Sequence, residues 1–107
     1  MFANVVTMDY KSPEGLKTVV DALAKEAARF RDAPGFQALH MVRTSPTQTV
    51  HTVVFDTEAD LMATREKMFP VLLQIAGPHV TQPPRQAPGP VVLNATGTHD
   101  VIVESNR

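Results

Sequence analysis

The fold is decided by six consecutive residues in the first half of the chain, Ala33-Pro34-Gly35-Phe36-Gln37-Ala38. Adjacent proline and glycine interrupt regular structure, so a helix that precedes them ends here. That helix is the clearest element of the sequence, because its apolar residues recur at the three- and four-residue spacing of one helical face. They are Leu16, Val19, Val20, Leu23, Ala24, Ala27 and Phe30. Ser12 is its predicted cap, and Pro13 is its predicted first residue.

The residues that follow Gly35 predict two strands joined by a short polar turn. Residues 36–43 and 49–55 are rich in β-branched and other apolar side chains, whereas residues 44–48 are polar. A short turn of this kind predicts an antiparallel hairpin. The alternation of side chains along a strand predicts two faces for the first arm. One face holds Phe36, Ala38, His40 and Val42, and the other holds Gln37, Leu39, Met41 and Arg43.

One further strand precedes this hairpin and a second helix follows it. Residues 3–8 are short and β-branched, and they predict the first strand. Thr57 is the predicted cap of the second helix, which Pro70 is expected to break or kink, leaving a short helical piece over residues 71–76. The predicted apolar stripe of this helix is Ala59, Met62, Glu66 and Phe69, with Leu61, Arg65 and Met68 beside it.

The last third of the chain is rich in proline. Residues 77–90 predict an extended connection without helix, and residues 90–96 predict the fourth strand. Residues 97–107 form a tail that bends at residues 97–99. Within the tail, residues 100–104 predict an extra strand on a sheet edge, either in the same chain or swapped onto a partner copy.

The order strand, helix, strand, strand, helix, strand predicts a ferredoxin-like α+β sandwich. We expect one domain over residues 1–107, with a four-stranded antiparallel sheet and both helices on one face. The strands are apolar on both faces, as the neighbours Val5 and Val6 illustrate. A sheet of this kind needs two coverings, and the helices supply only one. The sequence therefore predicts a homodimer in which the copies meet sheet to sheet.

Composition excludes several classes of protein. The net charge is −1, and the 10 Lys and Arg residues are scattered, so we expect no nucleic-acid partner. The chain has no cysteine, which excludes disulfides and thiolate metal sites and fits a reducing cytoplasm, where we expect the protein. No apolar run approaches the roughly 18 residues of a membrane span, and residues 1–6 lack the pattern of a signal peptide.

The junction Ala33–Ala38 resembles the "PGF" junction of the dimeric α+β barrel superfamily, particularly of antibiotic-biosynthesis-monooxygenase-like domains. The stretch Val53–Leu61 is similar to the end of their third strand and the start of their second helix, and the resemblance covers about residues 3–96. It implies that two sheets pack face to face as a barrel, with a pocket between the sheet and helices of each protomer. Members of the group include cofactor-independent monooxygenases of aromatic polyketides, haem-degrading monooxygenases and isomerases.

Two histidines, His40 and His51, lie on the two arms of the predicted hairpin and are candidates for catalysis. They are neighbours in a pocket if the register places them on one face, and otherwise one is partly buried and the other exposed. No pair of histidines has metal-ligand spacing, so we expect no metal. Phosphate-binding glycine loops are absent too, and we expect no nucleotide cofactor.

Asn4 is the third catalytic candidate, and the resemblance supplies the reason. Haem-degrading members of the superfamily use an asparagine on the first strand, a tryptophan at the end of the third and a histidine after the second helix. Asn4 and His79 stand in similar positions, but Phe55 takes the place of the tryptophan and the chain has no Trp. The missing tryptophan, and the predicted loop around His79, disfavour haem binding and degradation, which stays an alternative function. Phe55 and His79 are expected to contact substrate.

Tyr10 and Met41 complete the predicted substrate contacts. The Tyr10 hydroxyl suits a phenolic or quinone ligand, although a tyrosine there also suits a lid over the core. Met41 suits an adaptable apolar wall. We therefore expect a small apolar or aromatic ligand and, from the resemblance, cofactor-independent oxygenation of an aromatic or quinone-like substrate. The alternatives are a non-catalytic ligand-binding or stress-related dimer, and an interaction module whose tail joins chains edge to edge.

Overall fold

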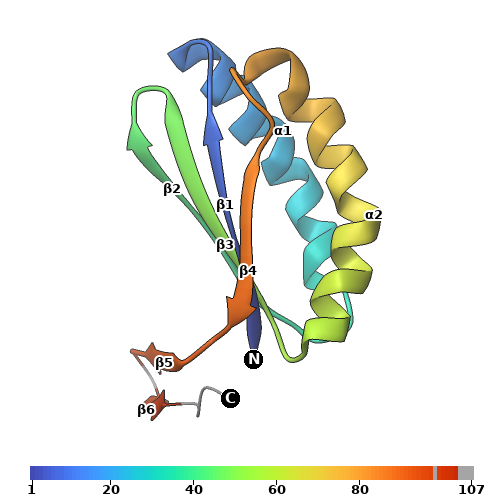
Figure 1. Cartoon of the computed structure of the whole chain (residues 1–107), viewed down its shortest axis with the longest axis vertical. Helices are drawn as coiled ribbons and strands as arrows, with labels where there is room; N and C mark the ends of the chain where they lie inside the picture. Colours follow the sequence, from blue (N-terminus) through green and yellow to red (C-terminus); the bar gives the residue numbers. More distant parts are fainter. Residues whose placement is uncertain (98, 104–107) are drawn as a thin grey trace.

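The computed structural model describes residues 1–97 and 99–103. One antiparallel sheet has the strand order β2-β3-β1-β4, and both helices pack on the same face of it, while the described chain leaves the other face uncovered (Figure 1). The elements of this body are β1 (Phe2–Asp9), α1 (Pro13–Arg31), β2 (Phe36–Ser45), β3 (Gln48–Phe55), α2 (Glu58–Ala76), the 3₁₀ turn η1 (Gly77–His79) and β4 (Arg85–Pro90). The predicted α+β class and element order are confirmed. Neither α1 nor α2, the helices of the described chain, is long and apolar enough to cross a membrane.

Both predicted helix caps are confirmed. The Ser12 hydroxyl accepts a hydrogen bond from the Gly15 N–H at 3.0 Å, and Thr57 accepts one from the Asp60 N–H at 3.1 Å. Each bond satisfies an amide that has no partner within its helix, and a cap of this type stabilises a helix by about 1 kcal/mol. These local bonds explain why the two helices begin where the sequence places them.

Gly35 makes the turn from α1 into β2. It has φ +76°, the only positive φ among the described residues, and a side chain at this φ is strained. Its carbonyl accepts the Asp56 N–H at 2.8 Å, which ties the turn to the end of β3. A Cβ on Gly35 would overlap the Asp60 carboxylate, because the α2 N-terminus lies directly against it. The turn therefore requires glycine for both conformation and space.

The prediction that Pro70 interrupts the second helix is wrong, because α2 runs without a break from Glu58 to Ala76. Proline there removes one backbone hydrogen bond and costs roughly 3 kcal/mol in a helix interior. The segment beyond it offsets this cost, since Ala76 is fully buried and Leu72 and Ile75 pack on the core. The predicted stripe is also out of phase: Leu61 and Thr64 are buried, whereas Ala59 and Glu66 are exposed.

The fourth strand of the sheet is Arg85–Pro90 and not residues 90–96, and η1 interrupts the segment predicted to lack helix. Pro88 and Pro90 pair with Asn4 and Phe2, and proline has no N–H to donate. Hydrogen bonds to β1 therefore fall on the intervening residues of β4, and the series continues with the Val91 N–H, which donates to the Met1 carbonyl at 3.0 Å. A strand rich in proline fits the sheet only with this alternation and only at an edge.

The end of the described chain forms a separate two-stranded sheet. Strands β5 (Leu93–Thr96) and β6 (His99–Val103) pair antiparallel, and they extend away from the body near the end where β4 finishes (Figure 1). An additional strand was predicted over residues 100–104, but β6 pairs with β5 and does not join the main sheet. Thr98 in the predicted bend, and Glu104 with the rest of the tail, lie outside the described residues.

A β-bulge changes the predicted faces of β2. The pairing with β3 shifts between Phe36 and Ala38, which moves Phe36 to the face that carries Leu39 and Met41. The Phe36 ring then meets the Phe55 ring edge to face, with centroids 5.8 Å apart and planes at 81°. The predicted alternation holds only beyond the bulge, from Ala38 onward.

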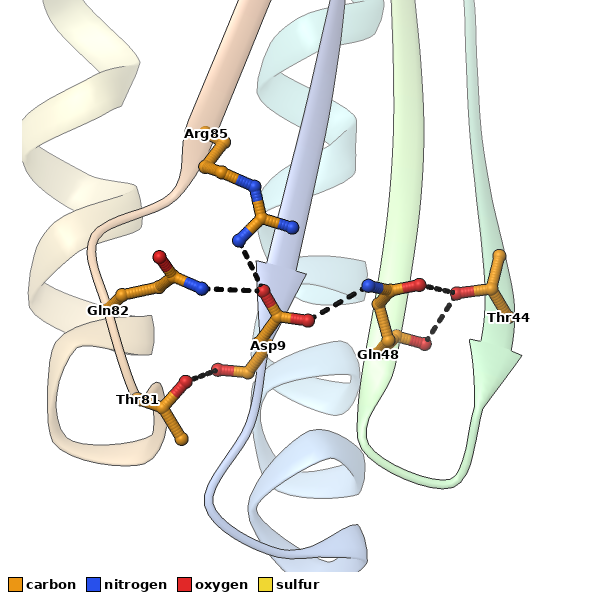
Figure 2. A network of polar contacts seen from close by, with 6 residues as sticks. All are labelled: Asp9, Thr44, Gln48, Thr81, Gln82 and Arg85. Atoms are coloured by element: carbon orange, nitrogen blue, oxygen red, sulfur yellow. Dashed lines mark hydrogen bonds and ion pairs between the residues drawn. The ribbon is translucent and has the colours of Figure 1, made fainter.

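Asp9 ties the strands together at one end of the sheet (Figure 2). Its carboxylate accepts hydrogen bonds from Gln48 of β3 at 2.9 Å and from Gln82 at 3.0 Å, and it forms an ion pair with Arg85 at the start of β4. The bond from Gln48 and then the Arg85 contact hold the pKa of this carboxyl below its usual value. The network fixes the start of β4, where the next residue, Gln86, enters the site described below.

Candidate functional site

A cavity of about 260 Å³ lies between the sheet and the two helices. It borders both parts of the core, the cluster around Val6 and the cluster around Phe55. Its wall is mostly apolar, which is typical of sites for small molecules. The apolar lining side chains from the strands are Val6, Leu39, Met41, Val53 and Phe55, and those from the helices include Val20, Leu23, Ala27, Phe30, Leu61, Met68, Phe69 and Leu72.

Three polar side chains enter the cavity from three different strands: Asn4 from β1, His51 from β3 and Gln86 from β4. The register brings them together, because Val6 of β1 pairs with His51 on one side and with Gln86 on the other. Asn4 stands two residues before Val6 and so points to the same face. The apolar wall therefore contains one compact polar patch on the sheet side.

His51 is the titratable group of this patch, and its pKa is strongly shifted. It is 9% exposed, and its Nδ1 is buried without a hydrogen-bond partner among the described residues. Burial disfavours the charged imidazolium and lowers the pKa of His51 to about 4. The side chain is therefore a neutral imidazole at pH 7, with a ring nitrogen free to accept a proton or a hydrogen bond.

Asn4 is held by one hydrogen bond and retains a free acceptor. Its Nδ2 donates to Gln86 Oε1 at 3.0 Å, whereas its Oδ1 is buried with no partner in the described chain. A buried amide oxygen without a partner costs about 1–3 kcal/mol. Asn4 is 4% exposed, so bulk water does not satisfy this oxygen. A ligand hydroxyl in the cavity would.

The helix side of the cavity carries a second set of polar residues, Glu26 from α1 and Thr64 and Arg65 from α2. Glu26 is ion-paired with Arg29 at 3.1 Å, one turn further along α1. Arg65 makes only weak contacts, with Met62 Sδ at 3.7 Å and with the Phe69 ring, 5.9 Å from its centroid. The two walls thus differ: the polar groups of the sheet are all neutral, whereas the helices carry two charged groups beside Thr64.

Four of the seven predicted site residues line the cavity: Asn4, His51, Met41 and Phe55. His40 does not, because it pairs with Thr52 and is exposed on the opposite face of the sheet. The register therefore separates the two histidines of the hairpin, and Met41 is the residue that stands beside His51.

Tyr10 and His79 also lie outside the cavity lining. Tyr10 is buried in the core, and its hydroxyl shares a hydrogen bond of 2.8 Å with Thr49, while burial raises its pKa. His79 packs against Gly15, where an added Cβ would lie 3.3 Å from the imidazole. The structure thus brings Asn4 and Phe55 together but leaves His79 apart from them.

Sequence reasoning missed Gln86, Thr64 and Arg65. Gln86 was hidden because the prolines around it suggested an extended connection rather than a strand. The sequence signal for Gln86 was the two-residue spacing of Pro84, Gln86 and Pro88, because side chains at this spacing on a strand lie on one face. Thr64 and Arg65 were missed because the predicted stripe of α2 was out of phase.

The arrangement suits proton transfer to and from a bound aromatic molecule. A neutral imidazole supplies a base, the Asn4 oxygen supplies an acceptor, and the apolar wall suits an aromatic ring. Within the described residues, no three His, Asp or Glu side chains gather as metal ligands.

No family model and no curated protein matches the sequence, whereas several solved structures match the fold. A protein of unknown function from Nitrosomonas europaea superposes with a TM-score of 0.78 at 18% identity, covering 92% of this chain and 95% of that one.

Two solved oxygenases share the same architecture. SnoaB, a cofactor-independent oxygenase from Streptomyces nogalater, has a TM-score of 0.66 at 17% identity, covering 92% of this chain and 97% of its own. The monooxygenase from the gene ActVA-Orf6 of Streptomyces coelicolor, in complex with the ligand nanaomycin D, has a TM-score of 0.67 at 18% identity, covering 97% and 92%. At these identities the likeness shows the fold, and the chain therefore has the fold of the antibiotic-biosynthesis-monooxygenase-like proteins.

Proposed function

We propose that the protein is a cofactor-independent monooxygenase of a small aromatic or hydroxyquinone-like substrate, which it binds in the cavity between sheet and helices. One observation carries this proposal: two buried polar atoms, His51 Nδ1 and Asn4 Oδ1, border an apolar cavity and have no partner in the described chain. Unpaired polar atoms are costly, and a substrate hydroxyl or ring C–H acid at this point gives both of them a function.

The reaction needs no external reductant, because the substrate itself supplies the electrons. His51 takes a proton from an anthrone-type substrate, and the resulting carbanion passes an electron to O₂. Recombination forms a C–O bond to a peroxide, which receives the proton back. Loss of water then breaks the O–O bond and leaves a carbonyl. The balance is CH₂ + O₂ → C=O + H₂O: carbon is oxidised, one oxygen atom enters the product, and the other leaves as water.

The size of the cavity and the solved neighbours support the same class of substrate. A volume of about 260 Å³ is just below the usual range of ligand pockets, roughly 300–1,000 Å³, and suits a small planar molecule. Oxygenation without a cofactor and binding of nanaomycin D are known for two neighbours of the same fold. For this chain, both remain part of the proposal.

The test is oxygen uptake with anthrone-type and hydroxyquinone substrates, comparing wild type with Ala27→Trp and Ala28→Trp. Ala27 lines the cavity, so tryptophan there fills it and should reduce turnover at least tenfold. Ala28 is exposed on the same helix and serves as the matched control. Equal turnover by both variants would contradict a reaction in the cavity. A cavity-dependent rise in melting temperature without oxygen uptake would instead indicate a non-catalytic binding protein.

We also infer that the protein works as a homodimer whose copies meet through the uncovered face of the sheet. Val5 and Val42 lie on this face and are 38% and 57% exposed, with the half-buried Val50 and Val54 between them. Exposed valines on a sheet face are costly in water, and a second copy covers them with an identical surface. Val92 and Leu93 are also exposed, at the point where the chain passes from β4 into the hairpin of β5 and β6. A partner copy would offer these two residues a surface as well.

Val42→Asp should dissociate this dimer, because it places a charge on the apolar face at one of its most exposed valines, on the edge strand β2. Sedimentation equilibrium should then show a monomer where wild type shows a dimer. The matched control is Leu73→Asp, which puts the same charge on an exposed leucine of α2, on the helix side of the molecule. A dimer that persists in Val42→Asp and dissociates in Leu73→Asp would place the interface on the helices.

A further inference from the structure

We infer that Arg65 forms an anion subsite in the cavity, so that the preferred ligand is an aromatic ring that carries a carboxylate. This inference rests on the proposed function, since it assumes that an aromatic ligand occupies the cavity. It adds the chemical class of that ligand's second functional group.

The position of Arg65 on α2 is the first observation. The side chains of α2 that line the cavity recur with helical spacing at Leu61, Arg65, Met68 and Leu72. A cation within a stripe that faces the interior is unusual, because burying charge costs free energy unless the charge is paired. Arg65 as a whole residue is half-buried at this position.

The second observation is that Arg65 lacks an acidic partner. No described carboxylate forms an ion pair with it, and its contacts are the sulfur of Met62 and the face of Phe69. These neighbours orient the guanidinium and leave most of its N–H donors unused. The acid on this wall, Glu26, has its Oε2 3.1 Å from Arg29 Nε but without hydrogen-bond geometry, and it forms no ion pair with Arg65.

The chemistry of the two walls defines the ligand. Guanidinium binds carboxylate through two parallel hydrogen bonds, which a neutral amide or ester does not reproduce. The apolar wall and Phe69 receive the ring, while His51 and Asn4 on the sheet receive a hydroxyl or C–H acid. A small aromatic acid fills both polar parts of the cavity at once.

The experiment compares 2-naphthoate with its neutral isostere 2-naphthamide by isothermal titration calorimetry at pH 7. Wild type should bind 2-naphthoate about tenfold or more tightly than 2-naphthamide, as expected for a charge-assisted bond. Arg65→Gln should abolish this preference, so that the variant binds 2-naphthoate no more tightly than 2-naphthamide. Lys67→Gln is the matched control, because it removes the same charge from an exposed position two residues further along α2.

The outcomes separate the inference from the proposed function. Equal affinity of wild type for both probes, or a preference that survives in Arg65→Gln, overturns the anion subsite but leaves an aromatic-binding cavity intact. A preference lost equally in Lys67→Gln also overturns it, since net charge would then be the cause. Binding of neither probe overturns the subsite and the proposed cavity together.

Discussion

His51→Ala is expected to lower kcat/KM for oxygen-dependent turnover of an anthrone-type substrate by about 10²–10⁴-fold, the usual contribution of a general base. The reason is that His51 is the only imidazole on the cavity wall of the described chain. Burial holds its pKa at about 4, so the base is free at neutral pH. The measurement is the rate of oxygen consumption against substrate concentration, with product formed in a ratio of one to one.

Two further measurements separate a base from a structural histidine. Added imidazole should restore part of the activity of His51→Ala, because the variant leaves a space in the cavity, and no rescue is expected for His51→Phe. The kcat/KM of wild type should stay constant as the pH falls until it nears 4, where His51 takes up its proton. His40→Ala removes the same side chain from the opposite face and should change kcat/KM less than about threefold. Equal losses in both histidine variants would contradict the assignment.

Gly35→Ala is expected to destabilise the protein by about 2–4 kcal/mol. Two causes combine: φ of +76° is strained for any residue with a Cβ, and the new methyl group collides with the Asp60 carboxylate. The measurement is urea unfolding followed by circular dichroism, which gives the free energy of unfolding at an unchanged m-value.

A matched glycine and a double variant test both causes. Gly77→Ala adds the same methyl group where nothing lies within 4 Å and where φ is −48°, so it should be neutral or slightly stabilising. Gly35→Ala combined with Asp60→Ala removes the collision but keeps the strain, and it should recover part of the loss. A loss no greater than that of Gly77→Ala would show that the turn adopts another conformation at no cost.

The sequence predicted the features that depend on neighbouring residues. Ser12 and Thr57 bond to amides three residues away, and Gly35 closes a turn within its own segment. Features that depend on distant pairing were less accessible. The prolines of β4 concealed a strand whose identity depends on its partner β1, and the face of His40 depended on a register that one residue in the turn reverses.

Four of the residues proposed from the sequence line the cavity. Asn4 and Phe55 were proposed from the resemblance, His51 as a histidine of the hairpin and Met41 as an adaptable apolar side chain. Gln86 and Arg65 were missed, because one required the pairing of β4 and the other required the phase of α2, which packing on the sheet decides. The prediction at Pro70 was wrong for a related reason. The local cost of proline in a helix is offset by the packing of Leu72 and Ile75 on the core.

The alternation of proline along β4 also protects the protein from aggregation. Strand β4 is at the edge of the sheet, and the backbone nitrogens of residues 86, 88 and 90 point away from β1. Two of these three residues are proline and carry no N–H, so along β4 only the Gln86 N–H is offered to an incoming strand. A misfolded or neighbouring chain therefore finds no template along β4, and growth into a continuous intermolecular sheet is blocked on that side.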